Sequence, residues 1–223
     1  MPIAGKGMLL TSMDIDPADD EDDFNRWYDA EHLEERVAID GFLEARRYLA
    51  HAGSPKYLCL YSTRTIEVLD SPAYRARLGQ PTDWSKKTMA KFRNMIRAVA
   101  RITISRGNGR GAVLGIVRLR PQAGQENALR TALNTRLDAS DLDGIISMHL
   151  IESDAKLSGP TTEIPAAGTG AADWFVLIDG TNVSAIASVL AARFTGTAAP
   201  AGAQLISSGI YDLMWELAKS DIP

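Results

Sequence analysis

The chain of 223 residues is 45% hydrophobic and 23% charged, values typical of a globular protein that buries a core. Its formal net charge of −4 argues against nucleic-acid binding, which needs a basic surface to neutralise phosphates. The single cysteine, Cys59, excludes an intrachain disulfide and fits a reducing compartment. We find no signal-like leader and no apolar run of bilayer length, so we expect a cytoplasmic protein that does not contact membranes.

The first predicted elements are a strand and an acidic helix. Residues 7–15 (GMLLTSMDI) are apolar and short enough for a strand, which an Asp-Pro pair ends. A helix is expected from Asp19 or Asp20, because carboxylates crowd its first turn, where the helix dipole favours negative charge. At about 100° per residue, a mainly apolar face of this helix is formed by Phe24, Trp27, Tyr28, Glu31, Glu35 and Ala38, with His32 at its edge.

Gly41 ends this helix, and alternating and apolar patterns predict the rest of the first half. The expected elements are strands over 42–50 and 56–63, short helical turns over 65–81, a helix that Thr82 or Asp83 caps and that continues to Met95 or Ile96, and a strand over 95–105. The order of the first half is therefore β-α-β-β-α-β.

The same order returns after a glycine-rich joint at 107–111 (GNGRG). The elements expected there are strands over 112–119, 145–152, 174–179 and 205–213, a helix after Pro121 and a helix over 183–194. This duplication predicts an α+β protein of two tandem ferredoxin-like units, 1–106 and 112–223, joined by the linker 107–111. Because each sheet must bury the face that its helices leave open, we expect the two sheets to face each other as a barrel with a cavity inside.

Side chains of a strand alternate between its two faces, which predicts the lining of that cavity. On the strand 42–50, Ala45 and Arg47 are expected beneath the helices. The residues expected to point into the barrel are Phe42, Glu44, Arg46, Tyr48, Tyr57, Cys59, Tyr61, Arg97 and Arg101. Tyrosine and arginine suit a flat anionic or phenolic ligand. For the two arginines of the strand 95–105, salt bridges between the sheets are the alternative.

Two neighbouring residues of the first helix are candidates for proton transfer. Glu31 lies within the apolar face, so we expect an ion pair with Arg47 that fixes the helix, with direct acid-base work as the alternative. His32 is the candidate general acid or base, because an imidazole titrates near neutral pH. The structural alternative is a histidine that packs against the next segment. Tyr28 is a core residue or a ligand contact.

The sequence gives little support for a metal or an organic cofactor, and we expect neither. The three histidines His32, His51 and His149 lack metal-ligand spacing, and Cys59 has no second cysteine. The acidic run 14–23 lacks the glycine and the glutamate of a calcium loop. Haem ligation through His32 is a further alternative.

The run W-Y-x-x-E-H-L followed by G-F-x-x-x-R-R-Y resembles the dimeric α/β-barrel superfamily, particularly its EthD-like members. The resemblance covers residues 7–106 and is carried by Trp27, Tyr28, Glu31, His32, Gly41, Phe42, Arg47 and Tyr48. The second half matches only in its order of elements, with Asn134 and Thr135 where the first half has Glu31 and His32, which implies one site per chain. The resemblance implies small-molecule chemistry, often without a cofactor, and in some branches oxygenation.

The sequence therefore predicts a cofactor-independent lyase, decarboxylase or isomerase that acts on a small aromatic or polyketide-like compound. His32 and Glu31 are the expected catalytic residues. The expected substrate contacts are Tyr28, Arg46, Arg47, Tyr48, Tyr61 and Arg97. The alternatives are a non-catalytic ligand-binding or assembly protein of the same fold and a cofactor-free monooxygenase. A homodimer is compatible with either.

Overall fold

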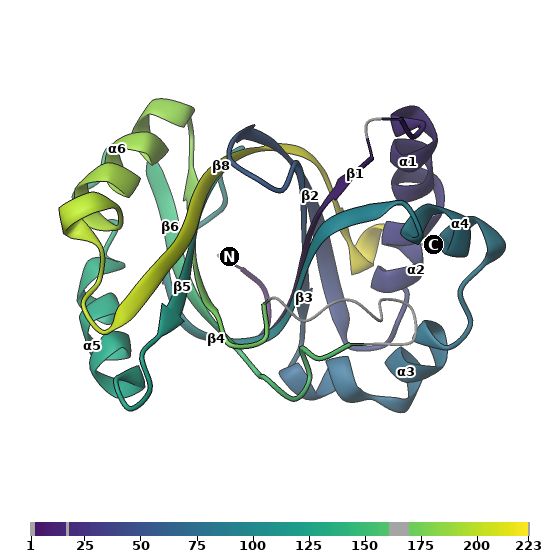
Figure 1. The fold of residues 1–223 in the computed structure, drawn as a ribbon, viewed down its shortest axis with the longest axis horizontal. Helices are drawn as coiled ribbons and strands as arrows, with labels where there is room; N and C mark the ends of the chain where they lie inside the picture. The colour runs from purple at the N-terminus through teal and green to yellow at the C-terminus, as the bar shows by residue number, and fades with distance from the viewer. Residues whose placement is uncertain (1–2, 17, 161–169, 223) are drawn as a thin grey trace.

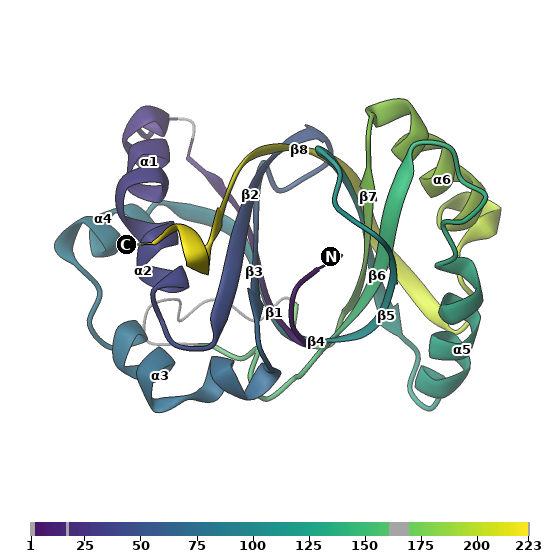
Figure 2. The ribbon, with the colours of Figure 1, turned by 180° about the vertical axis from the view of Figure 1, so that it is seen from behind.

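Eight antiparallel strands close into a single barrel in a computed structural model that describes residues 3–16, 18–160 and 170–222 (Figures 1 and 2). The strands are β1 (Gly7–Ile15), β2 (Phe42–Ala52), β3 (Tyr57–Thr63), β4 (Phe92–Gly107), β5 (Val113–Pro121), β6 (Ile145–Ser153), β7 (Trp174–Gly180) and β8 (Ala203–Ala218). Their order around the barrel is β1-β3-β2-β8-β5-β7-β6-β4. The predicted α+β barrel is thus confirmed.

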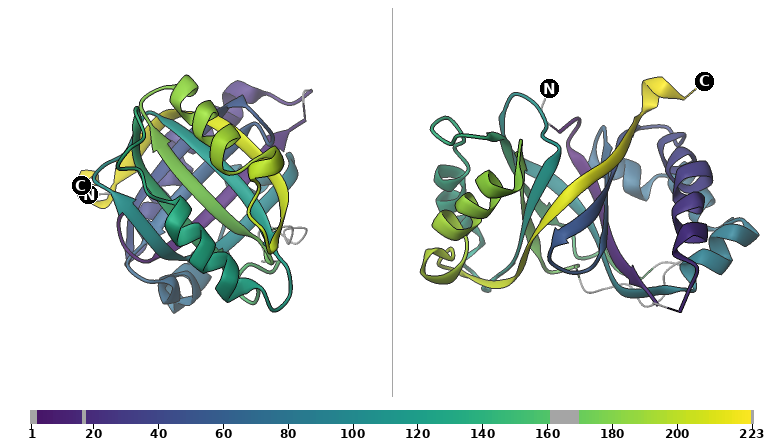
Figure 3. Two further views of the ribbon diagram at one scale, coloured as in Figure 1. Left: turned by 90° about the vertical axis from the view of Figure 1, so that its left-hand side faces the viewer. Right: turned by 90° about the horizontal axis from the view of Figure 1, so that it is seen from above.

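The helices lie outside the barrel, with α1 to α4 beside the wall of β1 to β4 and α5 and α6 beside the opposite wall (Figures 1 and 3). They are α1 (Glu21–Trp27), the π-helix η1 (Tyr28–His32), α2 (Leu33–Val37), the 3₁₀ helix η2 (Ile66–Asp70), α3 (Pro72–Leu78), α4 (Asp83–Met89), α5 (Glu126–Arg136), α6 (Val183–Arg193) and the short 3₁₀ helices η3 (Gly196–Ala198) and η4 (Lys219–Asp221). Within the described residues, none of these helices combines the length and apolarity needed to cross a bilayer.

Two long strands join the walls. β4 pairs with β1 and β6, and β8 pairs with β5 and β2. β8 continues past the predicted end of this strand at 213, because residues up to Ala218 find partners on β2. The predicted second helix is shorter than expected, since α4 ends at Met89 and Phe92 already begins β4.

The barrel interior is packed with side chains, which corrects the predicted ligand cavity there. Its buried residues are Met8, Leu10, Tyr48, Leu58, Leu60, Ala98, Ala100, Ile102, Leu114, Ile151, Phe175, Leu177 and Tyr211. Beside Glu44 and Arg46 only about 10 Å³ is left for the centres of water molecules. An eight-stranded barrel is just wide enough for its own side chains, so this result follows from the strand number.

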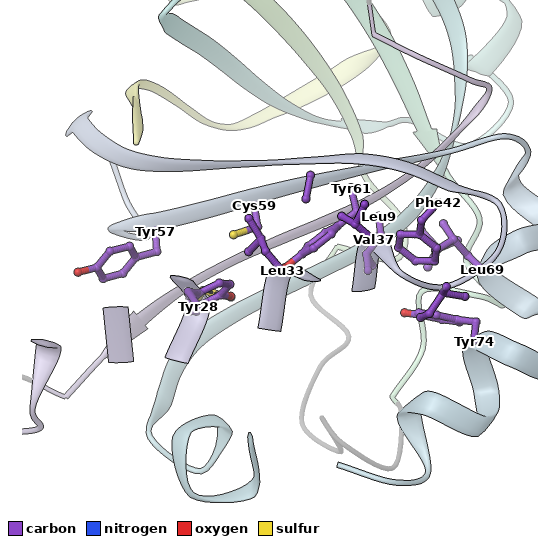
Figure 4. Close-up of a cluster of buried hydrophobic side chains, with 14 of the residues drawn as sticks. Leu9, Tyr28, Leu33, Val37, Phe42, Tyr57, Cys59, Tyr61, Leu69 and Tyr74 are labelled. Carbon is purple, nitrogen blue, oxygen red and sulfur yellow. Dashed lines mark hydrogen bonds between the residues drawn. The ribbon is translucent and has the colours of Figure 1, made fainter. Parts of the chain in front are cut away.

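Two strands have the opposite orientation to the predicted one. Tyr57, Cys59 and Tyr61 point from β3 toward the helices (Figure 4), while Leu58 and Leu60 fill the barrel. On β4, likewise, the alanines face the barrel, so Arg97 and Arg101 do not. Both faces of a helix-covered barrel wall are buried, and alternation therefore cannot tell which face is which. Narrow space inside the barrel favours the smaller side chains.

On β2 the predicted orientation is largely confirmed. Arg46 and Tyr48 face the barrel and Ala45 faces the helices. Phe42 is the exception, because a register shift between Phe42 and Glu44 turns its ring to the helix side.

Candidate functional site

A small enclosed cavity lies between the sheet and the helices of the first half. Its lining comes from β1, η1, α2, β3, α3, α4 and β4: Leu9, Thr11, Met13, Tyr28, His32, Arg36, Tyr61, Tyr74, Leu78, Met89, Phe92, Met95 and Arg97. About 30 Å³ is open to the centres of water molecules, room for roughly two waters. Ligand sites commonly offer about 300–1,000 Å³, so a substrate must displace part of this lining.

His32 is buried in this lining, with 8% of its surface exposed. The sequence placed it at the edge of the helix face, but the wider turn of the π-helix brings it onto the buried side. Its ring stacks on Trp27 with centroids 4.1 Å apart. Its Nδ1 atom has no hydrogen-bond partner among the described residues. A buried ring nitrogen without a partner, next to a cavity, is available to a ligand.

The surroundings of His32 keep it neutral. Burial lowers the pKa of His32 well below its usual value, and the positive charges of Arg36, Arg77 and Arg47 lower it further. A neutral imidazole is the form that accepts a proton. The imidazolium that results is costly here unless negative charge develops beside it.

Glu31 does not pair with Arg47, so that prediction is wrong. Its Oε1 atom accepts hydrogen bonds from Trp27 Nε1 at 3.2 Å, Thr82 Oγ1 at 2.6 Å and Ser85 Oγ at 3.0 Å. Thr82 caps α4 and Ser85 lies in its first turn. The carboxylate therefore holds α4, which contributes Met89 to the cavity, against η1.

Arg47 lies beneath the helix as predicted, but with other partners. Its guanidinium contacts Asp29 Oδ1 at 3.2 Å, donates to Asn25 Oδ1 at 2.6 Å and stacks 4.2 Å from the centre of the Tyr28 ring. The side chain is fully buried and does not line the cavity. Arg47 therefore positions the first helix and does not reach the cavity.

Two tyrosines of the cavity present neutral hydroxyl groups. Burial raises the pKa of both Tyr28 and Tyr61 well above the usual value. The Tyr28 hydroxyl donates to Met13 Sδ at 3.6 Å, whereas the Tyr61 hydroxyl has no partner among the described residues. Both rings point into the layer between sheet and helices in Figure 4. They can donate hydrogen bonds to an oxygen of a ligand.

Arg97 is brought to the same cavity from β4, although the prediction had it inside the barrel. It is 3% exposed. Its Nη1 donates to the carbonyl oxygens of Leu157 at 2.8 Å and Gly159 at 3.3 Å, and its Nη2 donates to the Tyr74 hydroxyl at 3.4 Å. Arg101, predicted to face inward beside it, is exposed and pairs with Glu67.

The predicted contacts Arg46 and Tyr48 lie on the barrel side of the sheet, away from His32. Arg46 pairs with Asp179 at 2.9 Å and donates to the Gly111 carbonyl at 2.9 Å. His149 lies 3.7 Å from the same carboxylate. The glycine-rich joint is therefore anchored, through Gly111, in a buried polar network between the halves.

Sequence reasoning missed part of the lining. Arg36 follows His32 by four residues, a spacing that shares one helix face, and this signal could have identified it. Tyr74 and the cavity methionines carried no comparable signal. The small residues of 158–172 predict a loop that either is disordered or closes over a cavity mouth. Most of this loop, residues 161–169, lies outside the described residues. Before it, Ser158 Oγ accepts from the backbone N–H of Val99 at 2.9 Å, so this part of the second half is attached to β4 beside the cavity.

Comparison with known proteins identifies the fold. No protein-family model matches the sequence, and no curated protein matches it by sequence. The structure of an anthrone oxidase-like protein superimposes with a TM-score of 0.68 at 11% identity, covering 99% of this chain and 96% of that one. A candidate chlorite dismutase gives 0.58 at 10% identity, covering 98% of each chain, and a proposed monooxygenase from Lactobacillus acidophilus gives 0.56 at 10%, covering 97% of each.

These similarities establish the fold alone, because the identities are low. The matched structures have the dimeric α/β-barrel fold, and so does this chain. The fold expected from the resemblance of the W-Y-x-x-E-H-L run is thus supported.

Proposed function

We propose that this protein is a cofactor-independent enzyme that removes a proton from a small aromatic or polyketide-like molecule bound between the first four strands and their helices. The observation that carries the proposal is the buried, neutral His32: this residue lines a cavity, and its Nδ1 atom has no partner among the described residues. The reaction class is a lyase, decarboxylase or isomerase step.

The proton passes from an acidic carbon of the substrate to Nδ1 of His32, in the tautomer that carries its hydrogen on Nε2. The electron pair stays on the substrate as an enolate, which hydrogen bonds from Tyr28 and Tyr61 and the charge of Arg97 stabilise. Return of the proton at another carbon gives an isomer, and departure of a leaving group with its bonding electrons from the neighbouring carbon gives a lyase product. In a decarboxylation the enolate forms instead when carbon dioxide leaves the substrate's carboxylate, and the carbon then takes up a proton through His32.

Within this proposal the other predicted residues have positioning roles. Glu31 fixes α4 over the cavity, and Arg47 fixes the helix that carries His32. Arg46 and Tyr48 contribute to the barrel and its joint and do not contact the substrate.

We also propose that the chain is a duplicated ferredoxin-like unit with an EthD-like first copy. The strand orders β4-β1-β3-β2 and β8-β5-β7-β6 are equivalent in the two halves, which supports units at 1–106 and 112–223 joined by 107–111. Further pairing into a homodimer and a cytoplasmic location belong to the same proposal.

A matched pair of histidine variants tests the function. Candidate carbon acids, including anthrone, are incubated with the protein and consumption is followed by chromatography. We expect His32→Gln to lower the rate by about 10²–10⁴-fold, the usual contribution of general acid-base catalysis. His51→Gln, which alters a half-exposed histidine beside Asp212, should leave it unchanged. Equal loss in both variants contradicts the proposal. Ligand binding without turnover in the unaltered protein identifies a binding protein instead.

A second candidate, a cofactor-free monooxygenase, is favoured by the similarity to the anthrone oxidase-like protein. Deprotonation at His32 is shared with the first candidate. The carbanion then reacts with oxygen, so that a CH₂ group and O₂ yield a carbonyl group and water. If turnover stops without oxygen and consumes one O₂ per product, the protein is a monooxygenase. If turnover is undiminished without oxygen, it is a lyase or an isomerase.

The residues around His32 do not fit a haem, which was the remaining alternative. The imidazole lies flat against Trp27, and about 30 Å³ of open space is far smaller than the macrocycle.

A further inference from the structure

Arginine side chains contribute to the lining of the cavity beside His32. Two arginines, Arg36 and Arg97, belong to its lining, and no aspartate or glutamate is among the described lining residues. Its other ionisable groups are three tyrosines and the histidine itself. The remaining lining is largely apolar, with Leu9, Leu78 and Phe92 among several aliphatic, methionine and aromatic side chains. The cavity thus offers positive charge within apolar walls.

Arg97 differs from Arg46 and Arg47, two other deeply buried arginines. Arg46 pairs with Asp179, and Arg47 pairs with Asp29. In the described part of the chain, the contacts of Arg97 are two carbonyl oxygens and one hydroxyl group, all of them neutral. A buried guanidinium without a carboxylate is costly, and an anion that enters the cavity removes that cost.

We propose that the ligand of this cavity binds as an organic anion whose phenolate, enolate or carboxylate oxygen pairs with Arg97. This inference rests on the site of the proposed function and adds the charge of its substrate. Arg97 is then the residue that determines specificity, because it selects the ionised over the neutral form of an aromatic acid. The apolar walls select an organic anion over an inorganic one, since a fully hydrated ion gains nothing from them.

The segment before the loop takes part in this selection. The carbonyl oxygens of Leu157 and Gly159 both accept from Nη1, which fixes the direction of the guanidinium. These residues belong to the second half of the chain, whereas His32 belongs to the first. The second half therefore contributes to ligand recognition by orienting Arg97.

A chromogenic phenol measures the effect without any turnover. The phenolate of 4-nitrophenol absorbs visible light and its phenol does not, so the ionisation of the bound probe can be read directly as pH is changed. A cation within about 4–6 Å lowers the pKa of a bound acid by roughly 1–3 units, equivalent to at least about tenfold tighter binding of the phenolate. The groups that face the probe are Tyr28, His32, Tyr61, Tyr74, Arg36 and Arg97. The neutral ether 4-nitroanisole cannot ionise, so any change in its binding with pH comes from titration of these protein groups.

Variants of β4 assign the effect. We expect Arg97→Met to remove the phenolate preference, Arg97→Lys to retain part of it, and Arg101→Met, on the same strand but exposed, to leave it intact. Inorganic phosphate should not displace the probe. Three results with the unaltered protein would each overturn the inference: preference for the neutral phenol, no binding of either form, or displacement of the probe by phosphate. These results do not depend on whether Arg97→Met folds.

The outcome separates this inference from the proposed function. His32→Gln should abolish turnover and keep the phenolate preference. Phenolate preference in a protein that turns over no carbon acid supports the anion site and contradicts the enzymatic role. Turnover by a protein that prefers the neutral phenol overturns the anion site alone.

Discussion

Replacement of Glu31 tests how the cavity is kept closed. The Glu31 carboxylate accepts from Thr82, Ser85 and Trp27, and Trp27 Nε1 has a second partner in Ser85 Oγ at 3.1 Å. Glu31→Ala therefore deprives the hydroxyl groups of Thr82 and Ser85 of a charged acceptor. The Trp27 indole keeps one acceptor, Ser85 Oγ. A hydrogen bond to a charged group contributes about 1.5–3 kcal/mol, and Thr82 can recover part of its loss from water.

These contributions predict that Glu31→Ala lowers the free energy of unfolding by about 2–4 kcal/mol. For a chain of this size the midpoint of thermal unfolding should fall by roughly 4–16 °C. Urea unfolding followed by tryptophan fluorescence gives the value, with Glu34→Ala, an exposed position of the next turn, as the control. We also expect faster amide hydrogen exchange in α4. If both variants lose the same stability and α4 exchanges no faster, the carboxylate does not hold α4.

Three further predictions follow from buried ionisable groups. Because the pKa of His32 is lowered in the folded protein, the unfolded chain binds the proton more readily. The contribution of this group to stability is therefore complete above about pH 6.5 and falls as the pH drops below it, by at most about 1.4 kcal/mol per pH unit. His32→Gln should reduce this pH dependence in urea titrations, and an unchanged slope would contradict the burial of the ring. Burial raises the pKa of the Cys59 thiol to about 11. Iodoacetamide at pH 8 should therefore alkylate the native protein at least about 100-fold more slowly than the unfolded chain. Comparable rates would show that the thiol is accessible. Arg46→Met leaves Asp179 buried without its partner and should lower the free energy of unfolding by about 3–5 kcal/mol. Asp179→Asn should restore part of this loss in the double variant. Additive losses in urea unfolding would show that the two residues are not coupled.

Local signals in the sequence predicted the elements well. Asp20 caps the first helix by accepting from the backbone N–H of Asp23 at 3.0 Å, and three acidic residues fill its first turn. Gly41 and Gly144 both have positive φ, at 87° and 75°, as expected where a helix region ends before a strand. Such signals depend on a few neighbouring residues, and tertiary packing did not override them.

The site was less predictable, because its location depends on which face of each strand meets the helices. The cavity was expected inside the barrel and lies outside it, so Tyr61 and Arg97 line it from the other side of the wall. The π-helix at Tyr28–His32 has no simple sequence signal, and it turns Glu31 toward α4 and His32 toward the cavity. The pairing of Arg47 with Asp29 instead of Glu31 is a consequence of the same turn.

The proposed enzyme needs His32 as its proton acceptor, and exchange of a carbon-bound hydrogen measures that step directly. Anthrone is incubated with the protein in deuterated buffer without oxygen, and deuterium uptake at its central CH₂ group is followed by NMR. We expect exchange at least about 100-fold faster with the unaltered protein than with His32→Gln. Equal rates with the two proteins, both above that of buffer, would place the base elsewhere and contradict the central claim.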